Sequence, residues 1–121
     1  MTFWYLASPY SKYPSGIFHA HIAACKQAAL LIKAGVSVYS PIAHSHSIAE
    51  HGGLDPLDHD IWLPADKPTA EAAGGLIVLK LEGWSRSFGI TQEIEWFAER
   101  GLPIVYMEPG VVPAKLLQGG R

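Results

Sequence analysis

The chain has 121 residues and a formal net charge of −2, so it carries no basic field that would attract polymeric nucleic acid. Its single cysteine, Cys25, excludes an internal disulfide and is typical of a cytoplasmic protein. No apolar run approaches the roughly 20 residues that a membrane helix needs, and the first residues lack the basic region of a signal peptide.

Apolar runs alternate with helical stretches along the chain. Residues 2–7 predict a short buried strand, and residues 36–40 predict a second one. Between them, residues 15–35 predict a helix, because apolar side chains recur four and three residues apart. The side chains on this expected buried face are Phe18, Ile22, Cys25, Ala29 and Ile32.

The middle of the chain is more polar. Residues 41–57 are rich in His, Pro and Gly and predict a polar loop with room for a helical turn. Residues 58–73 look helical, but they contain Pro64 and Pro68. Because proline removes a backbone donor and clashes with the preceding turn, we expect the helix to break between these two residues.

The last part of the chain returns to regular alternation. Residues 76–81 and 103–107 predict two further strands, and residues 89–100 predict the helix that joins them. The tail, residues 110–121, is rich in Gly and Pro and predicts a flexible end.

Strands separated by helices are typical of the α/β class. We expect a single domain over residues 1–121, with a small doubly wound parallel sheet of four or five strands, Rossmann- or flavodoxin-like, in three α/β/α layers. Ligands on such sheets bind at the carboxyl ends of the strands. The candidate ligand loops are therefore residues 8–14, 41–57 and 82–89.

One glutamate of the 89–100 helix stands out. With Ile90 at zero on a helical wheel, Glu93 lies at about −60°, on the edge of the buried stripe and in the first turn. The helix dipole favours an anion there, so Glu93 is expected to stay ionised even when partly buried. Ser87 and Gly89 precede it, and they are either a simple helix cap or part of an anion site. The alternative for Glu93 is a boundary residue that only stabilises the helix.

Three segments together resemble a known family. They are LIVLKLEGWSRSFGITQEIEWFAERGLPIVY (76–106), YLASPYS (5–11) and SPIAHSHSIAEHGG (40–53). They resemble DUF1937, a family of small proteins of unassigned function that is placed in the nucleoside 2-deoxyribosyltransferase superfamily. The resemblance implies an N-glycosidase or deoxyribosyltransferase acting on a deoxynucleoside or its 5′-monophosphate, with no metal and no cofactor.

The resemblance also implies roles for particular residues. Glu93 matches the nucleophile that attacks C1′ of the sugar, and Asp66 matches the acid that assists departure of the base. Ser87 matches a serine that helps to hold a phosphate, whereas Tyr5 and Ser8 fall where the family lines its sugar and base pocket. The characterised transferases also use an asparagine from a neighbouring subunit, and this sequence contains no asparagine.

Several alternatives stay open at this point. Asp66 precedes Lys67-Pro68, which is also the pattern of a helix N-cap. Tyr10 adds a hydroxyl to the candidate site. His44 either contacts the base from a covering loop or is plainly solvated, and a metal site built from the His-rich segment is a third possibility.

The same features predict the partners. We expect a nucleoside or nucleotide ligand and, because charged residues are only 17% of the chain against 49% apolar ones, a homo-oligomer. The alternative function is a nucleotide-binding or sensing module with no turnover.

Overall fold

Four short apolar runs form strands, and the stretches between them form helices. The structure is a computed structural model, and it describes residues 2–118. The strands are β1 (Trp4–Ala7), β2 (Val38–Tyr39), β3 (Gly75–Leu79) and β4 (Ile104–Met107). The helices are α1 (Ile17–Lys33), α2 (Pro41–Gly52), α3 (His59–Ala72), α4 (Phe88–Glu99) and α5 (Ala114–Gln118), with a 3-10 turn, η1 (Trp84–Arg86), before α4.

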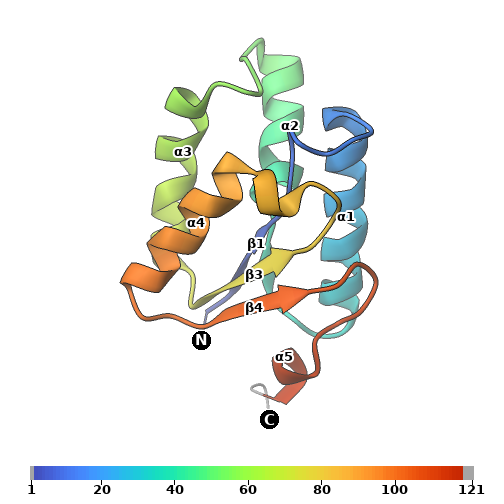
Figure 1. The fold of residues 1–121 in the computed structure, drawn as a ribbon, viewed down its shortest axis with the longest axis vertical. Helices are drawn as coiled ribbons and strands as arrows, with labels where there is room; N and C mark the ends of the chain where they lie inside the picture. Colours follow the sequence, from blue (N-terminus) through green and yellow to red (C-terminus); the bar gives the residue numbers. More distant parts are fainter. Residues whose placement is uncertain (1, 119–121) are drawn as a thin grey trace.

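The strands form one parallel sheet in the order β2-β1-β3-β4. Helices α3 and α4 lie on one side of the sheet, and α1 lies on the other (Figure 1). The predicted α/β class, parallel sheet and three-layer α/β/α arrangement are therefore confirmed.

The central strand β3 connects the two apolar cores. All five of its residues are buried. Ile77 and Leu79 pack into the core beneath α1, whereas Leu76 and Val78 pack into the core beneath α3 and α4. Each such side chain contributes about 1.5–3 kcal/mol by leaving water, so β3 anchors both layers.

The strand order sets the place of the ligand-binding edge. From β1 the chain passes through α1 to β2 on one side, and β3 lies on the other side of β1. In open parallel sheets, a crevice forms at the carboxyl ends of the strands where the order reverses in this way. That point lies between β1 and β3.

The segment predicted as a polar loop, residues 41–57, contains the helix α2, so this prediction is wrong. Ser40 caps the helix, because its Oγ accepts a hydrogen bond from the Ala43 N–H at 3.1 Å. Pro41 occupies the first turn, and Gly53 ends the helix with a left-handed φ of 73°. These start and stop signals compensate for the weak helix propensity of the residues between them.

The predicted break in α3 is also wrong. Pro64 and Pro68 both lie inside one continuous helix, and both are exposed. Ala70 of α3 is buried, and α3 packs against α4. We infer that these tertiary contacts outweigh the roughly 3 kcal/mol that an interior proline costs a helix.

The face of α1 that packs on the sheet differs from the predicted one. Its buried residues are Ala20, Ala24, Ala28 and Leu31. Phe18 and Ile32, predicted to be buried, are 55% and 60% exposed. Small side chains let the helix approach the sheet closely, so the alanine face packs inward although the other face is more apolar.

The tail packs against the core over more of its length than predicted. Leu116 of α5 is buried in the core beneath α1, and Val112 packs against the same core. Residues 119–121, the end of the segment predicted to be flexible, lie outside the described residues. None of the helices within residues 2–118 has both the length and the apolar character required to span a bilayer.

Candidate functional site

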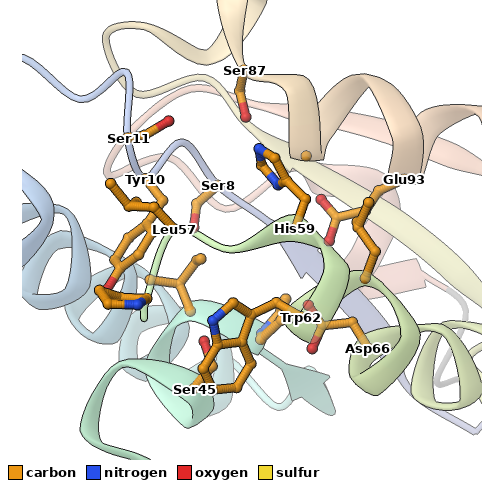
Figure 2. A pocket seen from close by; sticks show the side chains of 15 residues that line it. Ser8, Tyr10, Ser11, Ser45, Leu57, His59, Trp62, Asp66, Ser87 and Glu93 are labelled. Carbon is orange, nitrogen blue, oxygen red and sulfur yellow. The ribbon is translucent and has the colours of Figure 1, made fainter. Parts of the chain in front are cut away.

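A cavity opens at the carboxyl ends of β1 and β3, between α2, α3 and α4 (Figure 2). It holds about 650 Å³ of space, counting its open mouth. The loop after β1 supplies hydroxyl groups, the start of α2 supplies an apolar wall, and α3 and α4 each supply a carboxyl group.

Glu93 lies on the inner face of α4 and is 7% exposed. The hydroxyl of Tyr5, on β1, donates a hydrogen bond of 2.6 Å to Glu93 Oε2. The pKa of Glu93 is raised to about 8, chiefly by burial; the bond from Tyr5 lowers the pKa and the nearby charge of Asp66 raises it, so that the three effects together give this value. The expectation that the helix dipole keeps Glu93 ionised is therefore wrong, because desolvation is the larger effect.

Asp66 reaches the same cavity from the middle of α3 (Figure 2). Its carboxyl group is partly buried, and this burial raises its pKa to about 6. The cap of α3 is instead Asp58, whose Oδ1 accepts a hydrogen bond from the Asp60 N–H at 3.0 Å. The alternative interpretation of Asp66 as an N-cap is therefore wrong.

Tyr5 holds Glu93 from behind the cavity. It is fully buried, and its ring packs between those of Tyr39 and Phe97, with centroids 6.2 and 5.7 Å away. Burial, followed by the charge of Glu93, raises the pKa of the Tyr5 hydroxyl far above its usual range. Tyr5 therefore stays protonated and acts as a hydrogen-bond donor.

Hydroxyl groups line the side of the cavity opposite α3. Ser8 is 5% exposed, and among the described residues its Oγ has no hydrogen-bond partner. Ser87 caps α4, because its Oγ accepts from the Ile90 N–H at 3.2 Å, and Gly89 follows in the first turn. The buried Ser8 hydroxyl therefore remains available to a ligand.

Tyr10 is held by His46, a histidine of the His-rich segment for which no such contact was predicted. Its hydroxyl lies 2.6 Å from His46 Nδ1, and the His46 ring stacks on that of His21, with centroids 4.3 Å apart. His46 Nε2 lies 3.4 Å from Glu50 Oε1 but makes no hydrogen bond within residues 2–118. Burial, followed by the charge of His46, lowers the pKa of His21.

His44, the predicted base contact, lies outside the cavity. It is exposed and packs against the ring of Tyr39 at a centroid distance of 5.6 Å. In the helix α2, residues two apart point to nearly opposite sides, so His46 faces inward and His44 outward. His59 and Trp62 also line the cavity, from α3, and this position was not predicted from the sequence. The helical spacing of Trp62 and Asp66 was the signal that could have placed both on one wall.

A family model described as a domain of unknown function, DUF1937, matches residues 2–109. The chain belongs to the DUF1937 family. A comparison with curated proteins finds no match.

In this DUF1937 protein, most of the residues predicted from sequence meet at one place. Glu93, Asp66, Ser8, Tyr10, Ser87 and Gly89 line the cavity. Tyr5 lies behind it, bonded to Glu93, and His44 lies apart from it. Within residues 2–118, no three His, Cys, Asp or Glu side chains are grouped as metal ligands.

The chemical capacity of this DUF1937 site lies in its two carboxyl groups. Their environments differ, so near neutral pH the pair tends to hold one proton, with pKa values of about 6 and about 8. One carboxyl group can then act as an acid while the other acts as a base or nucleophile.

Proposed function

We propose that this protein cleaves the N-glycosidic bond of a deoxynucleoside or a deoxynucleoside 5′-monophosphate, either by hydrolysis or by transfer of the deoxyribosyl group. The observation that carries the proposal is the buried carboxyl group of Glu93, which lines the cavity together with Asp66. Glycosidic cleavage passes through an oxocarbenium-like state, for which two carboxyl groups with different protonation are the usual catalysts.

In the first step, Glu93 attacks the sugar. Because Glu93 has the higher pKa of the two, this step requires the proton of the pair to move to Asp66 when the substrate binds, which leaves Glu93 ionised. A bond forms between a carboxylate oxygen of Glu93 and C1′, and the bond between C1′ and the base nitrogen breaks. The electron pair leaves with the base, which takes the proton of Asp66. The positive charge that develops at C1′ favours the ionised form of Glu93, which offsets its desolvation.

In the second step, the sugar leaves Glu93. Water attacks C1′ and gives its proton to Asp66, and the bond from C1′ to Glu93 breaks. A second base in place of water completes a transfer. The bond from Tyr5 to Oε2 fixes the carboxyl group and leaves Oε1 for the sugar. The hydroxyl of Ser8, which lacks a partner among the described residues, is available to a sugar or phosphate oxygen.

Product analysis tests the proposal. The protein is incubated with deoxynucleosides and with their 5′-monophosphates, and free base is measured by chromatography. Glu93→Ala should abolish base release, whereas Glu95→Ala, an exposed position on the same helix, should leave it unchanged. Base release that persists in Glu93→Ala would remove Glu93 from the mechanism.

A nucleotide-binding or sensing module without turnover is the second candidate. Two observations favour it: the chain contains no asparagine, and burial raises the pKa of Glu93 to about 8, which favours the protonated form at neutral pH. Saturable nucleotide binding in calorimetry, with no base released over long incubation, would select this function over the first.

A further inference from the structure

A pair of stacked histidines lies between α1 and α2, next to the cavity. His46 of α2 is buried, and its ring stacks on that of His21 of α1, with centroids 4.3 Å apart and an angle of 14° between the planes. The ring of Phe18 packs beside both, with its centroid 6.3 Å from that of His46 and 6.5 Å from that of His21. Helix α1 therefore fixes the plane of the His46 ring, although the proposed reaction does not use this histidine.

The two ring nitrogens of His46 face different partners. Nδ1 lies 2.6 Å from the hydroxyl oxygen of Tyr10, which lines the cavity. Nε2 lies 3.4 Å from Glu50 Oε1, one helical turn further along α2, although this contact does not have the geometry of a hydrogen bond. Because a neutral imidazole carries one ring hydrogen on nitrogen, only one of the two nitrogens can donate.

The carboxylate of Glu50 determines which nitrogen of His46 carries the hydrogen. With the hydrogen on Nε2, the N–H dipole faces the carboxylate, and the lone pair of Nδ1 accepts a hydrogen bond from Tyr10. With the hydrogen on Nδ1, the lone pair of Nε2 would face the negative charge, which is repulsive, and this buried atom has no donor within residues 2–118. Tyr10 can donate, because burial, followed by the charge of Glu50, raises the pKa of its hydroxyl group.

We propose that His46 is a positioning residue for the cavity: Glu50 keeps it in the Nε2–H tautomer, and its Nδ1 fixes the Tyr10 side chain by accepting the hydrogen of the Tyr10 hydroxyl group. The inference rests on the proposed function only in that the cavity binds a nucleoside or nucleotide. A tyrosine hydroxyl group has one hydrogen and two acceptor lone pairs. Because His46 takes the hydrogen, a ligand group that reaches this oxygen must be a donor, such as a sugar hydroxyl or an exocyclic amino group of a base.

Nitrogen NMR of the histidine rings tests the tautomer, and no substrate is involved. In 15N-labelled protein at pH 8, Nδ1 of His46 should show the chemical shift of an unprotonated ring nitrogen, and Nε2 that of a protonated one. Glu50→Gln removes the charge and should bring the two shifts closer together, because both tautomers are then populated. Glu95→Gln, which removes an exposed carboxylate from α4, should leave them unchanged. A hydrogen on Nδ1 in the wild type, or shifts that do not move in Glu50→Gln, would overturn the proposal.

Ligand binding tests the positioning role. Deoxyadenosine and its 5′-monophosphate are the probes in calorimetry, and the parent protein is Glu93→Gln, so that no base is released during the measurement. His46→Leu should weaken binding by about threefold to tenfold, which is the net effect of one hydrogen bond. It should cause no further loss once Tyr10→Phe is present, because the bond is then already absent. His46→Asn, whose side-chain oxygen takes the place of Nδ1 as acceptor, should restore binding.

The outcomes separate this inference from the proposed function. Binding that is unchanged in His46→Leu, or losses that add in full when Tyr10→Phe is also present, would reduce His46 to a residue that packs α1 against α2 and would refute the positioning role. A parent protein that binds neither probe would count against the proposed function, and the shifts of the ring nitrogens then decide the inference alone. Circular dichroism of each variant checks that it is folded.

Discussion

Replacing Glu93 with glutamine should stabilise the folded protein, and the gain should grow as the pH rises from 5 to 8. The folded-state pKa of Glu93 is raised from 4.5 to about 8, chiefly by burial. Below the unfolded-state pKa of 4.5, Glu93 is protonated in both states and does not destabilise the fold. As the pH rises from there towards the folded-state pKa of about 8, the unfolded state loses this proton first, so the folded protein loses stability. Glutamine has no proton to lose, and its carbonyl oxygen can still accept the hydrogen bond from Tyr5.

The size of the effect follows from the pKa shift. Each unit is worth about 1.4 kcal/mol, so the unfavourable ionisation term is about 1 kcal/mol at pH 5 and about 4 kcal/mol at pH 8. The variant should therefore gain about 3 kcal/mol over the wild type across this interval. Subtracting the unfolding free energy of the wild type from that of the variant at each pH cancels the contributions of all other titrating groups, because both proteins contain them.

Urea denaturation at pH 5, 6, 7 and 8 measures this difference in unfolding free energy. Glu95→Gln is the matched control, because Glu95 lies on the same helix and is exposed. Its difference from the wild type should stay flat with pH. If the Glu93→Gln difference is equally flat, Glu93 is not held protonated by burial, and the assignment of protons within the pair fails.

Three further predictions concern the reaction. The pH profile of kcat/KM should be bell-shaped with limbs near 6 and 8, because only the singly protonated pair is active; a profile that keeps rising above pH 9 would contradict this. Asp66→Asn should slow base release by about 10²–10⁴-fold, and the loss should shrink for a nitrophenyl deoxyriboside, whose leaving group needs no proton; an equal loss for both substrates would argue against Asp66 as the acid. Tyr5→Phe should destabilise the protein by about 1–3 kcal/mol in urea denaturation. It should also move the upper limb to higher pH, because the hydrogen bond from Tyr5 lowers the pKa of Glu93 and its removal raises that pKa; an unmoved limb would show that the bond does not act on catalysis.

The sheet and Glu93 were accessible from the sequence because local patterns determine them, whereas Asp66 was placed in the site by the family resemblance alone. Bounded apolar runs such as residues 76–81 predict buried strands, and the alternation of strands with helices predicts a parallel sheet. Glu93 was found because one helical wheel placed it apart from Glu95 and Glu99. The elevated pKa of Glu93 was not accessible, since it depends on how completely other elements cover the carboxyl group.

The errors arose where tertiary contacts override a local rule. Ser40, Pro41 and Gly53 are start and stop signals for α2, but the composition of the segment concealed them, so His46 was not placed facing Tyr10. In α3, contacts with α4 outweigh the two prolines. In α1, the more apolar face was assigned to the core, although alanines pack closest to the sheet. Both faces of α1 are apolar, so its local pattern alone does not distinguish the face that packs inward from the one that faces outward.

The two prolines of α3 flank the part of the helix that lines the cavity. Pro64 and Pro68 have no amide hydrogen, so the helix has fewer internal bonds on either side of Asp66. Trp62 and Asp66 project from this same stretch into the cavity (Figure 2). Amide hydrogens here should exchange with solvent sooner than those of α4, through local opening that leaves the sheet intact. We therefore expect a bound ligand that contacts Trp62 and Asp66 to slow the exchange of these amide hydrogens.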